Sequence, residues 1–308
     1  MELMEVYIRA RAWETEARSL DFVQLLEKAV RSWDLPVRLR HQLRCMIGQD
    51  AAMNDMLACD TRLRVVSQDA MVQTLVDYWL PVISKARSMF FLTFADDRGI
   101  TSDRTPNLRC SSLQQKVAGA LKGLGLSAVV QTEIQGLMNY PQKGHGRLLL
   151  TNSHAIAWGD VSPRTISRKV GELNRSSVWT NHFGVKPILC REMKDGLADL
   201  VVVAHYIDKL PVEAKNLFKS KLYETMAGYR PEFALRLFEA LSYLRLPDIV
   251  MGIGEGQAVR DTWECRVAEW QEFRQRIDRE TPFLPMREFW RLARAENGSQ
   301  LFKAFKVA

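Results

Sequence analysis

The sequence lacks the long apolar runs that mark membrane proteins. Its longest apolar segments, such as LVVVAHYI, fall well short of the roughly 18 residues needed to cross a bilayer. The N-terminal stretch MELMEVYIRARAWETEARSLDF is charged from its second residue and has no apolar block of the kind found in secretory signals. These absences predict a soluble, cytoplasmic protein with no membrane partner.

Cysteine is too scarce and too scattered to build a framework. The five cysteines are odd in number, and no two of them form a C-x-x-C pair. A disulfide scaffold and a zinc knuckle are therefore not expected. The chain also contains no Walker sequence, no H-E-x-x-H and no G-x-S-x-G. P-loop, zinc-protease and serine-hydrolase chemistry thus lack their usual signatures.

The chain does have an excess of positive charge. The formal net charge is +7 and the isoelectric point is near 9.2. Such an excess favours a polyanionic partner but says nothing about how a nucleic-acid sequence would be recognised. The content of 47% hydrophobic and 26% charged residues is typical of a folded globular chain, which excludes a disordered one.

Hydrophobic periodicity divides the chain into three regions. Apolar residues three and four apart, as in FVQLLEKAVRSW, predict a helical N-terminal region over residues 1–88. Residues 89–212 alternate strand-like and helix-like segments and form the predicted core. A helical C-terminal region is expected over 213–308, with GIGEG at 252–256 interpreted as a break between helices. The fold class is therefore α+β, with a central antiparallel sheet and helical flanks.

The core begins with the strand-like segment MFFLTFADD and the helix-like SLQQKVAGALKGLG, which ends at a glycine. SAVVQTEIQGLM and RLLLTNSHAIAWG follow as two further strands. A helix is expected to start near Pro163, because proline suits a first helical turn. VKPILCREM then predicts a strand and DGLADLVVVAHYIDKLP a helix.

Asn152 and His154 stand two apart inside the apolar strand RLLLTNSHAIAWG. Side chains two apart on a strand share a face, so the amide and the imidazole are expected together. Four of the five histidines, His145, His154, His182 and His205, fall within residues 145–205. Two interpretations stay open: a hydrogen-bonded polar pair inside the sheet, or part of a functional site.

The order of three motifs in the core resembles the HUH superfamily of single-strand DNA nucleases, which includes rolling-circle replication initiators, transposases and relaxases. The first motif is the apolar strand FFLTF, and the second is NSH followed by AIAWG. The third is the tyrosine-to-lysine spacing of YIDK on a helix. The resemblance covers residues 89–212. It departs from the family pattern at Asn152, where the first histidine is expected, and at Ser153, where the family has a hydrophobic residue.

The resemblance implies an RRM-like core that nicks single-stranded DNA through a 5′-phosphotyrosyl intermediate. Tyr206 would be the nucleophile, and Lys209, one turn further, would contact the phosphate or the phenolate. A divalent cation, Mg²⁺ or Mn²⁺, would be held by His154, Asn152 and Glu133, with His145 as a substitute ligand. The expected partners are single-stranded DNA or an origin hairpin, together with host replication proteins of a plasmid or mobile genetic element.

The segment SPRTISRKVGELNR gathers positive charge directly after the NSH strand. It predicts a DNA-binding helix, with Trp158 and Trp179 as rings for base stacking. Its basic residues are Arg164, Arg168, Lys169 and Arg175. A solvated helix face with core tryptophans is the alternative.

Two other functions compete with the nuclease. One is a DNA-binding protein of the same ancestry that does not cut. The other is a helical interaction protein with no nucleic-acid role, whose positive charge is incidental.

Overall fold

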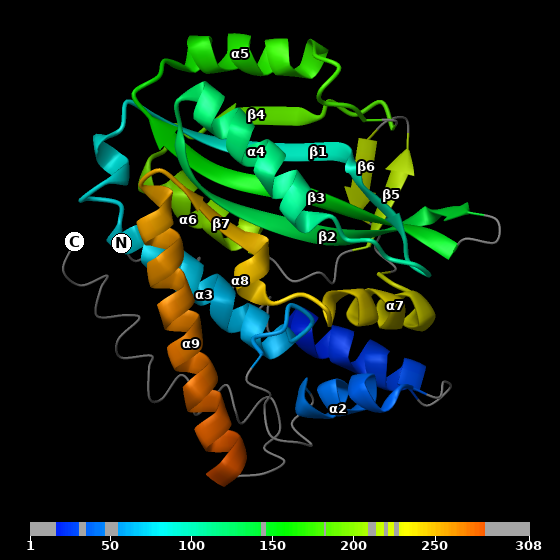
Figure 1. Cartoon of the computed structure of the whole chain (residues 1–308). Helices are drawn as coiled ribbons and strands as arrows, with labels where there is room; N and C mark the ends of the chain where they lie inside the picture. Colours follow the sequence, from blue (N-terminus) through cyan, green and yellow to red (C-terminus); the bar gives the residue numbers. More distant parts are fainter. Residues whose placement is uncertain are drawn as a thin grey trace.

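The computed structural model describes residues 17–30, 35–46, 55–142, 146–181, 183–208, 214–218, 221–224 and 228–280. These residues form an α+β fold in which helices cover both faces of a curled sheet (Figure 1). Within these ranges, no helix has both the length and the apolar character required of a membrane span.

Four strands form the antiparallel centre of the sheet, in the order β4-β1-β3-β2. They are β1 (Ser88–Ser102), β2 (Ser127–Gln142), β3 (Gly146–Gly159) and β4 (Ile188–Glu192). Helix α4 (Cys110–Leu124) connects β1 to β2, and helix α5 (Pro163–Arg175) connects β3 to β4. The strands and helices predicted from the sequence for this part of the core are confirmed.

Local sequence signals explain where the two connecting helices begin and end. Helix α4 stops at Gly125, which adopts a left-handed conformation with a φ of 75°. Helix α5 starts after Ser162, whose side chain accepts a hydrogen bond from the Thr165 amide at 3.3 Å. Pro163 occupies the first turn, where its missing N–H costs no helical hydrogen bond.

The region after residue 212 differs from the sequence-based expectation, because it is not wholly helical. It contributes three strands: β5 (Lys215–Phe218), β6 (Lys221–Glu224) and β7 (Val250–Ile253). Strand β5 pairs with β2 in parallel, so the sheet is mixed rather than purely antiparallel. Strand β7 pairs antiparallel with β2 near its start. Each of these strands has four residues, too few for the alternation that identifies a strand in a sequence.

GIGEG is the end of a strand and the start of a helix, not a break between two helices. Strand β7 ends at Ile253, Gly254 turns the chain with a φ of 58°, and helix α9 (Gly256–Glu280) begins two residues later. A Cβ atom on Gly256 would lie 1.9 Å from the Ala128 carbonyl oxygen. Glycine is therefore required because the start of α9 lies against the backbone of β2.

The two faces of the sheet have different characters. The α4 face carries Leu92, Val130 and Ala155, which pack in one apolar cluster with residues of α4 and α5. The opposite face, called the α6 face, carries Thr93, His154 and Gln131, which are cross-strand neighbours. Ala95, Asn152 and Glu133 form the next cross-strand row on the same face.

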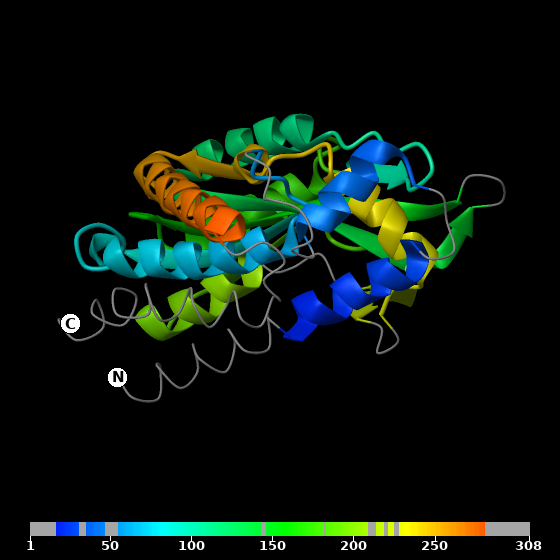
Figure 2. The ribbon, with the colours of Figure 1, turned by 90° about the horizontal axis from the view of Figure 1, so that it is seen from below.

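Helices α3 (Thr61–Asp77) and α6 (Leu197–Ile207) lie on the α6 face, across the sheet from α4 (Figure 2). Helix α9 packs against α3 and along β7 and β2. The remaining helices are residues 17–30, α2 (Val37–Met46), the short η1 (Ile83–Lys85), α7 (Pro231–Leu241) and α8 (Leu246–Ile249). One core cluster contains residues from all three regions distinguished in the sequence, among them Leu75, Ile156 and Trp263.

Two buried arginines converge on the last turn of α2. The Cys45 carbonyl oxygen accepts hydrogen bonds from Arg62 on α3 and from Arg274 on α9, the latter at 2.9 Å. Arg274 also pairs with the carboxylate of Asp60, whose other oxygen caps the start of α3. These guanidinium groups donate hydrogen bonds to carbonyl and carboxylate oxygens at helix ends that would otherwise be buried without a partner.

Candidate functional site

His154 lies in the middle of β3 on the α6 face and is only 3% exposed. Its Nε2 atom is 3.0 Å from Oε2 of Glu133, and its Nδ1 atom is 3.0 Å from the hydroxyl oxygen of Thr93. The two contacts fit the tautomer in which Nε2–H donates to the carboxylate and Nδ1 accepts from the hydroxyl. Both ring nitrogens therefore have partners on neighbouring strands.

Two aromatic rings cover the imidazole. Phe91 of β1 stacks on it with 5.7 Å between ring centroids and an interplanar angle of 19°. Tyr206 of α6 meets it edge-on, with 5.2 Å between centroids and an angle of 73°. The tyrosine is 41% exposed. The ring cluster is therefore open to solvent at the phenol, while the imidazole beneath is shielded.

Asn152 lies beside this cluster on the same face of β3. Its Nδ2 atom is 3.5 Å from Nε2 of His154, at the limit of a hydrogen bond. Its Oδ1 atom is buried and has no hydrogen-bond partner among the residues that the structure describes. The prediction that the amide and the imidazole share a face is confirmed.

The last turn of α6 is fixed by hydrogen bonds to the sheet and to α3, and this turn carries Tyr206. Asp208, the C-cap of the helix, accepts from the hydroxyl of Ser67 and from Nε2 of Gln131, the latter at 3.0 Å. Nε2 of Gln68 donates to the carbonyl of His205 at 2.5 Å. These contacts determine where the Tyr206 ring lies relative to β3.

A buried arginine lies close to both carboxylates of this region. Arg64 of α3 is 2% exposed, and its Nε donates to the carbonyl of Ala58 at 2.8 Å. Burial lowers the pKa of Arg64, while the charges of Asp208 and Glu133 oppose that shift. Burial raises the pKa of Asp208 to about 7, opposed by the Arg64 charge and the Ser67 hydrogen bond. The Tyr206 helix is thus anchored through a carboxyl group that titrates near neutrality.

At this site few side chains could hold a cation. The described part of the chain contains no group of three or more histidine, cysteine, aspartate or glutamate side chains arranged to hold a metal ion. Glu133 and His154 are in contact, and Asn152 adds an amide with an unpartnered buried oxygen. Carboxylate and amide oxygens suit hard ions such as Mg²⁺ and Mn²⁺ better than soft ones. An ion at Nε2 would have to displace the hydrogen bond to Glu133.

The structure brings together four of the site residues predicted from the sequence, namely Glu133, Asn152, His154 and Tyr206. His145 and Lys209, predicted as a substitute ligand and as a phosphate contact, lie outside the described residues.

The basic helix predicted to bind DNA lies on the other side of the sheet. Helix α5 packs Ile166 and Val170 into the cluster on the α4 face, so it is separated from His154 by the sheet itself. Its basic side chains are Arg164, Arg168, Lys169 and Arg175. Arg168 forms an ion pair with Glu172 at 2.6 Å, and Nζ of Lys169 donates to the Gly123 carbonyl at 2.9 Å.

The expectation that two nearby tryptophans stack on bases is wrong. Trp158 is 1% exposed and Trp179 is 4% exposed, so neither presents a ring face to a ligand. Nε1 of Trp158 donates to Glu255 at 2.9 Å, and Lys116 covers the Trp179 ring at 4.2 Å from its centroid. Both rings stabilise the core instead.

Several residues that shape the site were not predicted from the sequence. Thr93 is polar within the otherwise apolar segment MFFLTF, which is a usable signal of a hydrogen-bonded partner. Asp208 is an acid at a helix C-terminus, where the helix dipole disfavours negative charge, so a compensating contact was to be expected. Ser67 and Arg64 carry no comparable signal, because a helix rich in charge is normally solvated.

Comparisons of the chain with protein-family models, with curated proteins and with solved structures gave no match. The site is accordingly interpreted from its own geometry.

Proposed function

We propose that this protein cleaves single-stranded DNA through Tyr206, as the nicking component of a replication initiator or mobile-element protein. The observation that carries the proposal is the edge-on packing of the Tyr206 ring against the His154 ring, with 5.2 Å between their centroids. The two residues come from the motifs that resemble the HUH superfamily. An exposed phenol next to a buried imidazole–carboxylate pair is an arrangement in which a strand can reach the nucleophile from solvent.

The arrangement of the strands supports the same proposal. The order β1–α4–β2–β3–α5–β4, with β4-β1-β3-β2 across the sheet, is the β-α-β-β-α-β pattern of ferredoxin-like folds. We infer that this part of the chain is the RRM-like core implied by the HUH resemblance. The site then lies on the α6 face of the two central strands.

In the proposed reaction the phenol oxygen of Tyr206 attacks the phosphorus of a phosphodiester. A bond forms between that oxygen and phosphorus, and the bond to the 3′ oxygen of the preceding nucleotide breaks. The phenol releases its proton to water, and the departing 3′ oxygen takes one up. The products are a 5′-phosphotyrosyl protein and a free 3′-hydroxyl, which can prime synthesis.

The chain's own residues hold the reacting groups in place. Asp208, bonded to Ser67 and Gln131, fixes the turn that carries the nucleophile. Glu133, Asn152 and His154 are the residues that would hold a divalent cation, Mg²⁺ or Mn²⁺, and the proposal extends to His145 as a further ligand. Such an ion, when bound, neutralises charge that develops on the phosphate. Lys209 remains the proposed phosphate contact, and the α5 arginines a proposed second DNA contact on the opposite face.

The test is covalent capture of DNA. The protein is incubated with Mn²⁺ and a library of single-stranded oligonucleotides labelled at the 3′ end, and products are separated in denaturing gels. We expect a labelled protein band with the wild type and none with Tyr206→Phe. Tyr243→Phe is the matched control, because Tyr243 is a 63% exposed tyrosine on another part of the surface. A labelled band that persists in Tyr206→Phe would refute Tyr206 as the nucleophile.

A second candidate function is a single-strand DNA-binding protein that does not cut. It is favoured by the burial of His154 and by the partners of both its ring nitrogens. In that case the same oligonucleotides bind, with an affinity that falls steeply as salt rises, but no covalent band forms at any Mn²⁺ concentration. If the oligonucleotides neither bind nor form an adduct, both proposed DNA functions are refuted.

A further inference from the structure

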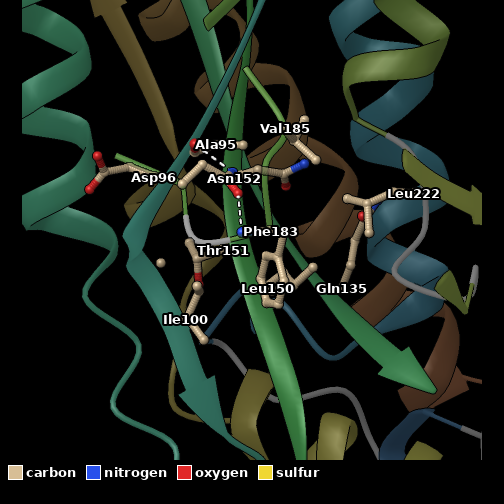
Figure 3. Close-up of a pocket in the computed structure, with 12 residues that line it drawn as sticks. Ala95, Asp96, Ile100, Gln135, Leu150, Thr151, Asn152, Phe183, Val185 and Leu222 are labelled. Carbon is tan, nitrogen blue, oxygen red and sulfur yellow. Dashed lines mark hydrogen bonds between the residues drawn. The ribbon is translucent and has the colours of Figure 1, made fainter. Parts of the chain in front are cut away.

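A small pocket beside Asn152 limits how a DNA strand can be held near Tyr206 (Figure 3). Its space for solvent is about 40 Å³, which is enough for a few water molecules and too little for a nucleobase. Phe183, which lines the pocket, already packs against Leu150 in one apolar cluster. On the proposed function, the strand is therefore held on the exposed surface around Tyr206 and not inside this pocket.

Arg191 of β4 is an exposed cation on that surface. Its side chain is 60% exposed, and its Cζ atom lies 6.0 Å from the ring centroid of Phe91, its cross-strand neighbour on β1. The Phe91 ring in turn meets the Tyr206 ring edge-on, with 5.6 Å between centroids and an interplanar angle of 88°. One aromatic ring therefore connects the Arg191 guanidinium to the proposed nucleophile. The guanidinium of Arg64 is buried and cannot meet a strand in solvent.

The hydrogen-bond donors of Arg191 are available to a ligand. Among the described residues its side chain makes no hydrogen bond, and its one ion pair is with Asp199 of α6, at 4.0 Å between Nη2 and Oδ1. An exposed pair at this distance contributes little to stability. The other oxygen of Asp199 accepts from the Asp195 amide at 3.1 Å, at the start of α6. A phosphate can therefore replace Asp199 at the guanidinium, with two parallel hydrogen bonds, and leave the start of the helix intact.

Exposed apolar side chains lie beside Arg191 and extend toward Tyr206. Leu189 precedes Arg191 by two residues on β4, so both project from the α6 face, and Leu189 is exposed. Asp199, Val202 and Tyr206 are three and four residues apart on α6 and share one side of the helix. Val202 is exposed as well. A cation among exposed apolar and aromatic side chains is typical of surfaces that bind single-stranded nucleic acids.

We propose that Arg191 binds a backbone phosphate of the DNA strand that reaches Tyr206. The inference rests on the proposed function and adds to it a residue that positions the substrate. The guanidinium exchanges Asp199 for the phosphate and so directs the strand across β4 toward the phenol. Leu189 and Val202 contact the sugars and bases of that strand.

Binding of a fluorescein-labelled single-stranded oligonucleotide tests the inference without any need for cleavage. Fluorescence anisotropy is measured with the full-length protein over a series of salt concentrations, with EDTA present to remove divalent cations. Arg191→Gln is expected to weaken binding about ten-fold, the loss for one hydrogen-bonded charge contact. It is also expected to reduce the slope of log Kd against log salt by about 0.7, the value for one phosphate of a single strand. Arg191→Lys keeps the charge and is expected to keep most of that slope.

Asp199→Asn separates a DNA contact from a structural ion pair. The amide keeps an oxygen for the Asp195 amide and removes a negative charge beside the phosphate, so binding is expected to strengthen about two-fold. If the pair only held α6 in place, Arg191→Gln and Asp199→Asn would both weaken binding. Arg236→Gln is the matched control, because Arg236 on α7 is also exposed and pairs with a carboxylate, that of Glu239 at 3.1 Å. It is expected to bind as the wild type does.

The outcomes of this test and of the covalent-capture test are distinguishable. Wild-type affinity and salt slope in Arg191→Gln, or weaker binding in both Arg191→Gln and Asp199→Asn, refutes the phosphate contact even where a Tyr206 adduct forms. No binding by the wild type refutes it as well. Opposite effects of the two variants support the contact even where no adduct forms, and the cleavage proposal then fails by itself.

Discussion

Glu133 and His154 form a buried pair at the centre of the sheet, with 3.0 Å between Oε2 and Nε2 and 3% exposure of each side chain. The pair joins β2 to β3, and Thr93 extends it to β1. Because both members are shielded from water, their contact satisfies a buried polar atom on each residue.

Removing one member of this pair is expected to lower the free energy of unfolding much more than a conservative replacement does. His154→Leu leaves a buried carboxylate without its imidazole and is expected to lower the free energy of unfolding by about 3 kcal/mol or more. Glu133→Gln keeps a hydrogen-bonding oxygen and is expected to lose about 1 kcal/mol. Urea denaturation followed by circular dichroism measures both. Equal losses in the two variants would show that the pair is not coupled.

Asp208 is expected to make stability depend on pH. Its pKa is raised from 3.8 to about 7 in the folded chain, so the folded protein holds a proton that the unfolded chain has released between those pH values. The contribution of Asp208 to the free energy of unfolding therefore falls as pH rises from about 4 to 7, with a slope of up to about 1.4 kcal/mol per pH unit, and levels off above pH 7.

Asp208→Asn removes this titration. Urea denaturation of the wild type and the variant at several pH values between 4 and 8 gives the difference between them. We expect the stability of the wild type relative to the variant to fall across that range. A difference that is constant with pH would mean that Asp208 does not titrate there. Asp261→Asn on the exposed side of α9 is the control and is expected to leave the wild-type pH profile unchanged.

Asn152→His tests whether position 152 can take part in cation binding. A second imidazole beside His154 and Glu133 gives a better donor set for Mn²⁺ than an amide. We expect the variant to bind Mn²⁺ more tightly, as measured by electron paramagnetic resonance of the free ion. Asn107→His places the same imidazole on an exposed loop and is expected to bind as the wild type does. Unchanged affinity in Asn152→His would assign Asn152 a structural role.

Alanine substitutions at two glycines are expected to change the stability of the protein in opposite directions. At Gly136 a Cβ atom would lie 2.4 Å from Cε1 of Phe233 and 2.6 Å from Cε1 of Tyr229, so Gly136→Ala is expected to cost about 2 kcal/mol. At Gly119, in the middle of α4, a Cβ atom meets nothing within 4 Å. Gly119→Ala is expected to stabilise by about 0.5–1 kcal/mol, because alanine favours helix. Thermal unfolding measures both variants.

The core of the fold could be predicted because its signals are local. A few neighbouring residues are enough to recognise the apolar segments of β1 and β3. The same is true of the glycine that ends α4 and the proline that starts α5. Strands β5, β6 and β7 could not be predicted in this way. Strands β5 and β7 pair with the edge of β2 that β3 leaves free, and β6 pairs with β5, so all three depend on the assembled sheet.

The site was predictable only in part, for a similar reason. Asn152, His154 and Tyr206 were found through motif order, which the sequence displays directly. Arg64 and Ser67 were not, because α3 is buried nearly all round and its polar residues act only once α6 has packed against it. The pocket near Phe183 was missed because three strands and a distant loop create it jointly.

The shared carbonyl of Cys45 has a consequence for biosynthesis. Arg274, one of its two donors, follows it by 229 residues in the chain. While the protein is still being translated, the end of α2 lacks this partner, and the buried Arg274–Asp60 pair cannot exist. We therefore expect the nascent N-terminal helices to remain protease-sensitive until α9 has left the ribosome and can supply Arg274.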